Sequence, residues 1–358
     1  MIIDAYSHVC PKPLLDAVLA IKPMLSLEAL ATSYLSDADR RIEFLDRLGI
    51  EMQVLTLVRP PMWLGMERKD VHRLVRVAND SMAEFAARHP DRFAAVAVMP
   101  FVDDELMTEL RRARDELDMK GALIFTNIDG LPLDDESMWP LYEEAAASGL
   151  PIWIHPQDGH SYPWVERDRV DLMFGWPFET SLAMARLVFG GVVGRFPSLR
   201  FVTHHLGGMV PFYAGRIDSI RRRHRPNRPA ADDTSSSSAQ LAEPETMELF
   251  RSFFADAMVT GWQPGLRCGL DFFGPERVVY GSDFPMGLDG GEADAAAVLD
   301  SIRELDLSES ERELILAGNA RRLLGFDGPA PTTPNFSTGV GAPVQPRADD
   351  LPVVKGFL

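Results

Sequence analysis

The sequence predicts an α/β fold and, within that class, a (β/α)8 TIM barrel. Three observations carry this prediction: short apolar runs alternate with longer segments of helical periodicity, the runs number eight, and residues 1–326 contain them all. Such alternation is typical of parallel strands joined by crossover helices. Eight strand–helix units favour a closed barrel, and a doubly wound open sheet is the main alternative.

The predicted strands are runs of apolar and β-branched residues, as expected for parallel strands covered on both faces. In chain order they are Met1–Tyr6, Met52–Val58, Phe93–Met99, Gly121–Phe125, Leu150–Ile154, Leu199–Thr203, Phe253–Asp256 and Arg277–Tyr280. Apolar residues at helical spacing predict helices between them. The clearest predicted helices are Asp37–Leu48, Val71–Arg88, Asp104–Leu117 and Met138–Ala147.

Two stretches depart from this alternation. Residues 224–245 include "PNRPAADDTSSSSAQ", a composition that predicts a mobile insertion after the sixth strand. Residues 327–358 are rich in Pro, Gly and Thr and predict an extended C-terminal arm or tail. The expected organisation is therefore one barrel domain, 1–326, followed by a tail, 327–358.

Composition restricts the classes of function. The chain has 358 residues and a net charge of −17, which argues against nucleic acid and anionic membranes as partners. Only two cysteines are present, Cys10 and Cys268, and two cysteines do not form a disulfide framework. No basic and apolar leader opens the sequence, and no apolar run reaches membrane-spanning length. We expect a cytoplasmic protein.

Reactive side chains follow several of the predicted strands. His8, His155, the pair His204-His205 and Asp283 come at or just after the ends of four of them. In a barrel of this kind the active site lies at the C-terminal ends of the strands, so these side chains are expected on one rim. Imidazole and carboxylate groups suit a divalent cation such as zinc or manganese. A metal site with nearby proton-transfer groups is therefore predicted.

The motifs in which these residues occur resemble a known family. They are "IDAYSHV", "RIEFLDRLGIEMQVL", "IWIHPQD", "GWPFETSLAMARLVFGG", "RFPSLRFVTHHLGG", "GRID" and "RVVYGSDFPMG", which appear in matching order from about Met1 to Phe326. The chain resembles the amidohydrolase superfamily, in the branch that contains aminocarboxymuconate-semialdehyde decarboxylase and γ-resorcylate decarboxylase. The resemblance implies a (β/α)8 barrel that binds a divalent metal.

Carried over residue by residue, the resemblance implies specific roles. His8, His155 and Asp283 match metal ligands, and His205 matches the catalytic histidine of the decarboxylases, with Asp283 sharing the proton transfer. Successive residues of a strand face opposite sides, so only one of the two adjacent histidines is expected in the site, and His204 is expected to be a core residue or one that supports the ligands from behind. Arg216 matches an arginine that reaches a substrate carboxylate across a dimer interface, which implies a homodimer; a surface salt bridge is the alternative.

Tyr6 departs from the family, which places histidine or sometimes glutamate there. Ionising a phenol at pH 7 costs roughly 4 kcal/mol, because its pKa is about 10. Three outcomes are open: a phenolate ligand, a neutral phenol that hydrogen-bonds substrate or water beside a weakened metal site, or a site without metal. The second is preferred, and it predicts a divalent metal at low occupancy with Tyr6 as a catalytic group.

Three further residues are candidates for substrate binding. The semialdehyde decarboxylase has an extra substrate-binding arginine in a region where this chain has "KPMLSLEALATSY", which contains no arginine and counts against the same muconate substrate. Arg59, at the end of the second predicted strand, could meet an anionic group instead. Trp176 and Phe284 lie within the family motifs and are candidate pocket walls, with core packing as the alternative.

The expected function is decarboxylation of a conjugated or aromatic carboxylic acid, which makes the chain a carbon–carbon lyase with a small carboxylate as its substrate. One alternative is a hydrolase or hydratase on the same scaffold, acting on a lactone, an amide or an activated alkene. Another is a binding subunit that has lost catalysis. Product analysis separates the first two, because released CO2 identifies a decarboxylase.

Overall fold

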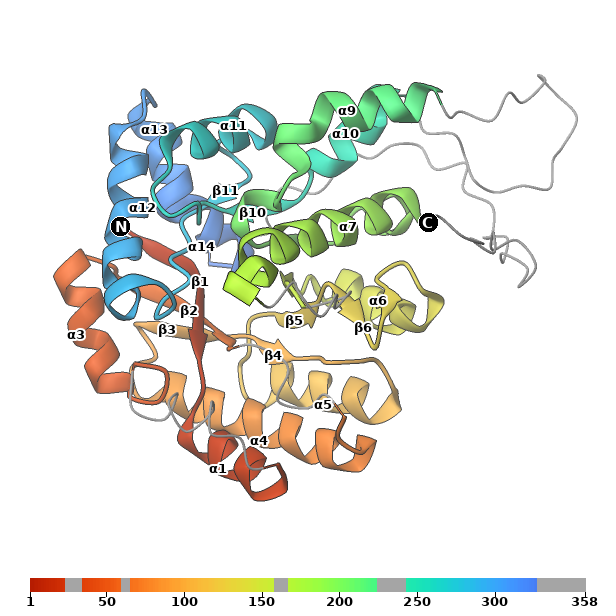
Figure 1. Cartoon of the computed structure of the whole chain (residues 1–358). Helices are drawn as coiled ribbons and strands as arrows, with labels where there is room; N and C mark the ends of the chain where they lie inside the picture. The colour runs from red at the N-terminus through yellow and green to blue at the C-terminus, as the bar shows by residue number, and fades with distance from the viewer. Residues whose placement is uncertain (23–33, 59–64, 158–166, 224–242, 327–358) are drawn as a thin grey trace, which may run out of the picture.

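A computed structural model describes residues 1–22, 34–58, 65–157, 167–223 and 243–326 (Figure 1). Arg59 and the predicted arm 327–358 lie outside the described residues. So does the predicted insertion, except for residues 243–245, which belong to helix α10 (Glu243–Arg251). In the described part, no helix combines the length and the apolar character that crossing a membrane would require.

All eight predicted strands are present. They are β1 (Ile3–Val9), β2 (Met52–Leu57), β3 (Phe93–Ala95) with β4 (Ala97–Val98), β5 (Ala122–Phe125), β8 (Ile152–His155), β9 (Phe201–Thr203), β10 (Phe254–Asp256) and β11 (Val278–Val279). The predicted third strand is interrupted at Val96 and so forms both β3 and β4. A short antiparallel hairpin, β6 (Asn127–Ile128) and β7 (Leu131–Pro132), was not predicted.

The strands form a closed ring. One sheet has the order β1-β2-β3 and the other β11-β10-β9-β8-β5-β4, with every pair parallel, and the kinked β3–β4 strand joins them. At the other junction Ala5 N donates to Tyr280 O at 2.8 Å, and Asp283 N donates to Tyr6 O at 3.0 Å. An open doubly wound sheet would leave both of these edges unpaired, so the barrel prediction is confirmed.

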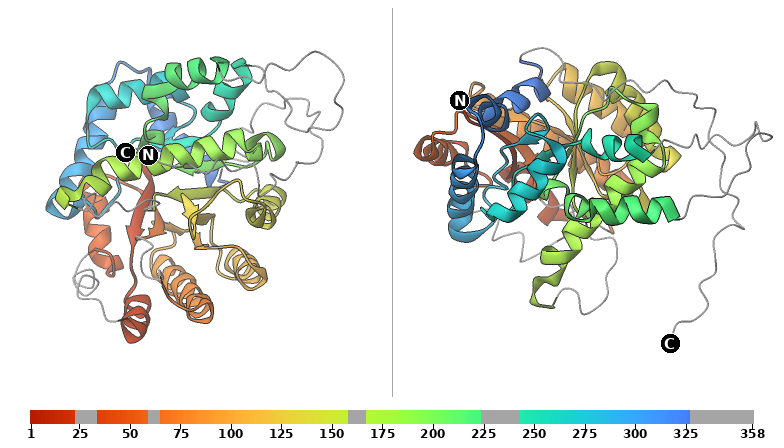
Figure 2. Two further views of the ribbon diagram at one scale, coloured as in Figure 1. Left: turned by 45° about the vertical axis from the view of Figure 1, so that its right-hand side comes forward. Right: turned by 90° about the horizontal axis from the view of Figure 1, so that it is seen from above.

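Helices surround the strands on the outside (Figure 2). The larger ones are α1 (Lys12–Ile21), α3 (Ala38–Leu48), α4 (Arg68–Ala87), α5 (Asp104–Asp115), α6 (Trp139–Ser148), α7 (Trp176–Phe189), α9 (Val210–Arg223), α10, α11 (Gln263–Phe273) and α12 (Glu292–Glu304). Shorter helical segments are α8 (Val192–Arg195), α13 (Glu309–Glu313) and α14 (Asn319–Leu323). The four clearest predicted helices are confirmed.

Helix α3 shows why these boundaries are readable. Asp37 precedes it, and its side chain accepts a hydrogen bond from Arg40 N, which satisfies a donor that the first helical turn leaves free. Gly49 ends the helix in the left-handed conformation, with φ 70°, which glycine adopts without a steric penalty. Local chemistry thus marks both ends of this helix.

Strand β1 contains a bulge that positions the first site residues. The register with β2 shifts between Asp4 and Ser7, so Ala5 and Tyr6 together oppose one residue of β2. The Ala5 carbonyl, displaced from the β1–β2 ladder, accepts a hydrogen bond of 2.9 Å from the Trp153 indole. The bulge thereby helps to position two buried aromatic side chains, Tyr6 and Trp153.

A buried polar network supports β1 from behind. The Arg41 guanidinium of α3 is fully buried, donates to the carbonyl oxygen of His8 and reaches Gln53 Oε1 at 3.0 Å. Gln53 in turn donates to Asp4 at 2.6 Å, and Asp4 accepts from Ser282 N at 2.9 Å. Strands β1 and β2, helix α3 and the segment before Asp283 are therefore fixed relative to one another.

Candidate active site

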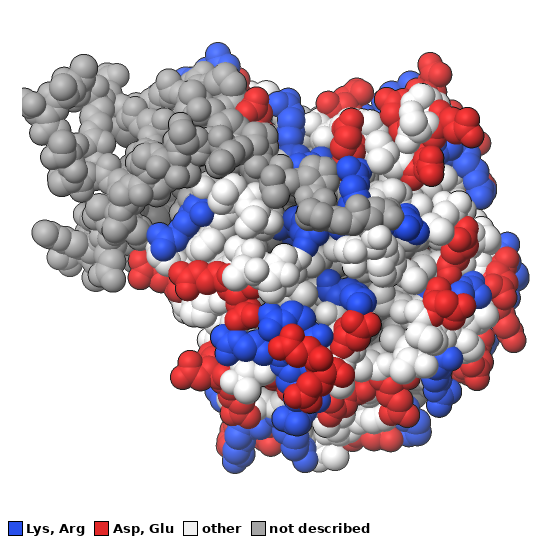
Figure 3. All heavy atoms as spheres, turned by 180° about the vertical axis from the view of Figure 1, so that it is seen from behind, with Lys and Arg blue, Asp and Glu red and all other residues white. Residues whose placement is uncertain are grey.

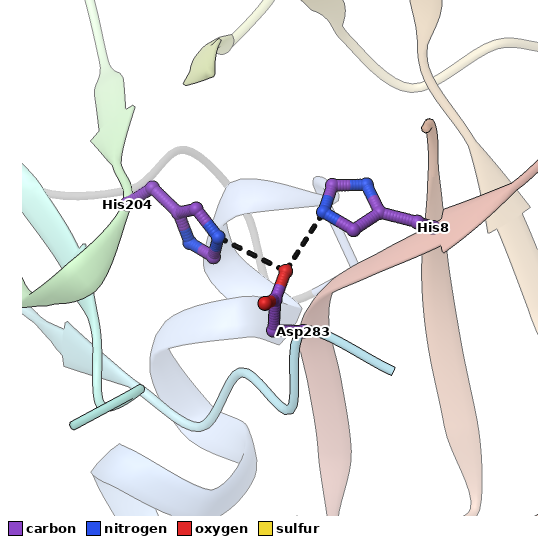
Figure 4. A group of neighbouring side chains, drawn as sticks. All are labelled: His8, His204 and Asp283. Atoms are coloured by element: carbon purple, nitrogen blue, oxygen red, sulfur yellow. Dashed lines mark hydrogen bonds and ion pairs between the residues drawn. The ribbon is translucent and has the colours of Figure 1, made fainter. Parts of the chain in front are cut away.

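The candidate active site is a cluster of imidazoles around one carboxylate (Figure 4). His8 lies near the end of β1 and His204 follows β9, while Asp283 follows β11. The Oδ1 atom of Asp283 is 2.8 Å from His8 Nε2 and 3.1 Å from His204 Nε2. His155 ends β8, and its ring centroid is 5.1 Å from that of His8. The predicted gathering at the C-terminal ends of the strands is present.

Three of the imidazoles, those of His8, His155 and His204, have a hydrogen-bond acceptor next to the Nδ1 atom. Thr56 donates its hydroxyl hydrogen to the Ser7 carbonyl, so its oxygen accepts from His8 Nδ1, at 2.8 Å. His155 Nδ1 donates to the carbonyl of Pro156 at 2.6 Å. When neutral, both rings therefore carry the lone pair on Nε2.

His204 follows the same pattern with a charged acceptor. Its Nδ1 atom is hydrogen-bonded to the carboxylate of Asp256, the last residue of β10, and both side chains are fully buried. A histidine that binds a metal is commonly oriented by such an acceptor on its other nitrogen. The cluster thus presents three oriented Nε2 atoms and one carboxylate.

Burial and mutual charge shift the pKa values in this cluster. Burial, with the neighbouring His8 and His204, holds the pKa of His155 well below its ordinary value. Burial alone would lower the pKa of His204, but the carboxylates of Asp256 and Asp283 raise it to about 10. Burial would also raise the pKa of Asp283, yet the adjacent His204 and His8 hold it well below the usual range.

His204 was expected in the core or behind the ligands, whereas the structure places its Nε2 atom 3.1 Å from Asp283 Oδ1, within the cluster. Strand β9 ends at Thr203, and His205 and Leu206 have positive φ angles of 49° and 54°. The alternation of faces along a strand does not apply to residues beyond its end. The His204 and His205 rings instead stack at 3.8 Å between centroids.

His205 lies beside the cluster as expected for a site residue. Its buried Nδ1 atom has no hydrogen-bond partner among the described residues. Burial and the neighbouring charge of His204 lower the pKa of His205 to about 4, so its imidazole is neutral at pH 7. A neutral imidazole next to an ionised carboxylate can accept a proton.

The structure opposes two of the three outcomes considered for Tyr6, the phenolate ligand and the phenol that hydrogen-bonds substrate or water. Its hydroxyl group donates to the backbone carbonyl of Ile154 at 3.1 Å, so this hydrogen is not available to substrate or water. Burial, with the charges of Asp256 and Asp283, raises the pKa of Tyr6 well above 10, which opposes a phenolate ligand. The phenol ring is stacked on His204, with centroids 4.2 Å apart and planes at 13°.

The predicted substrate-binding residues are scattered. Trp176, the first residue of α7, makes an edge contact with His155 at 5.4 Å, so it borders the site. Phe284 is fully buried and stacked on Phe44 of α3 at 3.6 Å, and it is therefore a core residue. Arg216 is exposed on α9.

Two functional neighbours were not foreseen from the sequence. Asp256 closes the strand motif "FFAD", and a polar residue at a strand end is the signal that could have identified it. Thr56 lies inside β2, where a β-branched residue gives no such signal. Both hold an imidazole by its Nδ1 atom.

This donor set fits a divalent cation. The ligand atoms of His8, His204 and Asp283 lie within 4.8 Å of one another. The Nε2 atoms of these imidazoles are the nitrogen donors that zinc and related ions take, and a carboxylate oxygen completes such sets. A (β/α)8 barrel with histidines and an aspartate at the ends of its strands defines the class of metal-assisted barrel enzymes.

The chain belongs to the amidohydrolase family: the family model described as "Amidohydrolase" matches residues 30–326. A 2-amino-3-carboxymuconate-6-semialdehyde decarboxylase from Dictyostelium discoideum is 32% identical over 297 residues, covering 81% of this chain and 77% of that protein. A γ-resorcylate decarboxylase from Polaromonas sp. is 29% identical over 80% of this chain and 86% of that protein.

A solved structure has the same fold. It is a dihydroxybenzoic acid decarboxylase from Polaromonas sp. JS666 with bound manganese and the inhibitor 2-nitroresorcinol. The TM-score is 0.72 at 23% identity, covering 91% of this chain and 97% of that chain. The family that the sequence motifs implied is confirmed.

Proposed function

We propose that this chain is a carbon–carbon lyase that removes CO2 from a conjugated or aromatic carboxylic acid with the help of a divalent metal. The observation that carries the proposal is the imidazole cluster around Asp283: His8 and His204 contact its carboxylate, His155 lies beside His8, and His205 is stacked on His204. Relatives over most of the chain are decarboxylases, as their names state. An aromatic or conjugated substrate follows from the chemistry of those relatives.

The cation is zinc or manganese, with His8, His155 and Asp283 as ligands. Their oriented Nε2 atoms and the ionised carboxylate support this assignment. The Polaromonas structure of the same fold contains manganese. When bound, such an ion supplies positive charge that holds and polarises a carboxylate.

His205 and Asp283 carry the proton in the proposed reaction. The bond between the carboxyl carbon and its neighbouring carbon breaks, CO2 leaves, the electron pair stays on the remaining carbon, and that carbon receives a proton that His205 and Asp283 take up from water and deliver. The buried Nδ1 atom of His205 has no hydrogen-bond partner among the described residues, and Asp283 Oδ1 lies 2.8 Å from His8 Nε2 and 3.1 Å from His204 Nε2. Trp176 forms an apolar border that orients the substrate. Arg59 remains a candidate partner for an anionic group of the substrate.

We further propose a homodimer that works in the cytoplasm. Phe212, with 76% of its surface exposed, and Arg216 lie four residues apart on α9 and so share one face. An exposed aromatic side chain beside an arginine is typical of the centre of a protein interface. Two free cysteines, Cys10 and Cys268, suit a reducing compartment.

The test is an assay of purified protein with hydroxybenzoates and carboxymuconates, following both CO2 release and water addition. We expect CO2 release, which is lost in His205→Asn and kept in His72→Gln, a histidine paired with Asp103 outside the cluster. Addition of water without CO2 would instead identify a hydratase. Binding without any turnover would identify a binding subunit.

Metal removal gives a separate prediction. Dialysis against a chelator should abolish CO2 release, and added Mn²⁺ or Zn²⁺ should restore it, because the imidazole nitrogens and the Asp283 carboxylate release and rebind the cation reversibly. Activity and bound metal are measured on the same samples. Full activity in samples shown by elemental analysis to lack metal would contradict the metal-dependent form of the proposal.

A further inference from the structure

We infer that His204 is a ligand of the same cation. It supplies the imidazole that β1 lacks because residue 6 is a tyrosine. The inference rests on the proposed function, because it concerns the metal assigned to His8, His155 and Asp283. Its basis is geometric: the Nε2 atoms of His204 and His8 approach one and the same oxygen, Oδ1 of Asp283.

The cluster already has the shape of a shared coordination site. The two imidazoles flank Asp283 from opposite sides in Figure 4, and the ligand atoms of the three residues lie within 4.8 Å of one another. Zinc–nitrogen bonds are about 2.0–2.1 Å, so one ion can join donors at this separation after small shifts. His155 is the third imidazole of the proposed set; its ring lies next to the group, with centroid distances of 5.1 Å to His8 and 5.8 Å to His204.

Tyr6 and His204 form a complementary pair. The phenol hydroxyl is engaged with the Ile154 carbonyl, so position 6 contributes no ligand atom. The phenol ring covers one face of the His204 imidazole, and the His205 ring is stacked on it as well. A tyrosine on β1 therefore fixes the plane of a histidine that enters the site from β9, and the loss of a nitrogen at one position is offset at the other.

Asp256 is the positioning residue for His204. Its Oδ2 atom accepts from His204 Nδ1, and its Oδ1 atom accepts from Met258 N at 2.9 Å, so the carboxylate is fixed at both oxygens. This arrangement, carboxylate to histidine to metal, orients the ring and increases its basicity. Asp256 itself points to the imidazole and is not proposed as a ligand.

A purely structural ion pair is the competing account. In that case His204 would only bridge two buried carboxylates, Asp256 and Asp283. Such a bridge contributes little net stability because desolvation opposes the attraction. It would also make the stacked Tyr6 irrelevant to metal binding. The two accounts therefore differ in whether the Tyr6→His substitution restores metal binding to a chain that carries His204→Gln.

The experiment measures bound Mn²⁺ and the visible spectrum of the Co²⁺-loaded full-length chain. Wild type is compared with His204→Gln, with Tyr6→His/His204→Gln, and with the matched control His72→Gln. We expect wild type and the control to retain metal after gel filtration, His204→Gln to lose it, and the double variant to recover it. The Co²⁺ spectrum should change in His204→Gln at saturating metal, since one nitrogen ligand is lost.

Each outcome decides a separate point. Equal metal affinity and spectrum in wild type and His204→Gln would overturn the inference and leave the proposed function standing. A wild-type chain that binds no metal would overturn both. Metal binding without CO2 release would overturn the proposed reaction and leave the ligand set intact.

A second variant covers the case in which His204→Gln does not fold. Asp256→Asn keeps the size of the side chain and should lower metal affinity by about 10- to 100-fold, the usual effect of removing an outer acceptor. Urea unfolding of the apo proteins separates this loss from instability. Unchanged affinity in a folded Asp256→Asn chain would contradict the positioning role.

Discussion

Tyr6 contributes an aromatic surface to the cluster, and its hydroxyl group is directed to the Ile154 carbonyl. We predict that Tyr6→Phe keeps metal affinity unchanged, because the ring that stacks on His204 is kept. The free energy of unfolding should fall by about 1–3 kcal/mol, since a buried carbonyl loses a partner. Metal titration and urea unfolding check the two parts. A large loss of metal with normal stability would show that the hydroxyl is a ligand.

Gly281 permits the close approach of Tyr6 and Asp256. A Cβ atom at this position would lie 2.7 Å from Asp256 Cβ and 3.1 Å from Tyr6 Cβ. Gly281→Ala should therefore displace the Asp256 carboxylate, weaken metal binding and destabilise the fold by about 1–3 kcal/mol. Gly194→Ala is the control, because its Cβ would meet nothing within 4 Å. Equal metal affinity in both variants would contradict the expected displacement.

Residue roles were only partly predictable from the sequence. The clustering of His8, His155, His205 and Asp283 could be predicted, because polar residues after apolar runs are visible in the letters, whereas their roles stay predictions. His204 could not be placed, since the left-handed residues that follow Thr203 cancel the alternation of the strand. The same limit applies to Phe284, where the motif gave no indication that the ring faces α3.

Among the helices and strands, Asn79 links three elements. It lies in α4, accepts from Val98 N of β4 at 3.0 Å and donates to Glu109 of α5 at 3.0 Å. Asn79→Ala should lower the free energy of unfolding by about 2–5 kcal/mol, because a backbone N–H and a carboxylate both lose a buried partner. Urea unfolding measures this loss. A change below about 0.5 kcal/mol, typical of surface sites, would contradict the assignment.

Glu109 makes stability depend on pH. Burial would raise its pKa, but hydrogen bonds from Arg112 and Asn79 lower it below 4.5. Its contribution is therefore complete above about pH 4.5 and is lost as the pH falls through the lower, folded-state pKa. Below pH 4.5, the free energy of unfolding should depend less steeply on pH in Glu109→Gln than in wild type. The free energies of unfolding of both proteins are measured with urea from pH 3 to 6. An equal pH dependence in the two would contradict this assignment.

Elements were predicted more accurately than single residues. The capped helix α3 begins one residue after the predicted start, because Asp37 is its N-cap. The bulge in β1 was not predictable, since nothing in "IDAYSHV" distinguishes a regular strand from a displaced one. This bulge determines where Tyr6 lies, so the direction of its hydroxyl group could not be predicted from the sequence.

On the scale of the whole molecule, charged side chains of both signs are interspersed, whereas several exposed apolar side chains follow one another along α7. Basic and acidic side chains are interspersed on the face shown in Figure 3, within a chain of net charge −17. Exposed apolar residues recur at intervals of four across the turn that precedes α7 and along α7 itself: Phe174, Phe178 and Leu182. Helix α9 packs nearby, with the Arg221 guanidinium over the Phe189 ring at 5.1 Å.

This apolar surface gives the prediction for assembly. Phe178→Glu combined with Phe212→Glu should convert the proposed dimer to a monomer in analytical ultracentrifugation, because two charges would be buried in the interface. Phe326→Glu, at an exposed residue that belongs to neither α7 nor α9, is the control. A wild-type chain that sediments as a monomer at all concentrations would contradict the dimer.

The junction between the first and last strands has a consequence for how the enzyme becomes competent. His8 and Asp283 are 275 positions apart, yet the backbone bonds that seal the barrel, such as His8 N to Phe284 O at 2.7 Å, occur at the same place. Contacts between such distant positions form only after the long chain segment between them has been closed into a loop, which costs conformational entropy. Cation uptake therefore reports a finished barrel, and a chain that ends before β11 would have imidazoles without their shared acid and an exposed edge on β1.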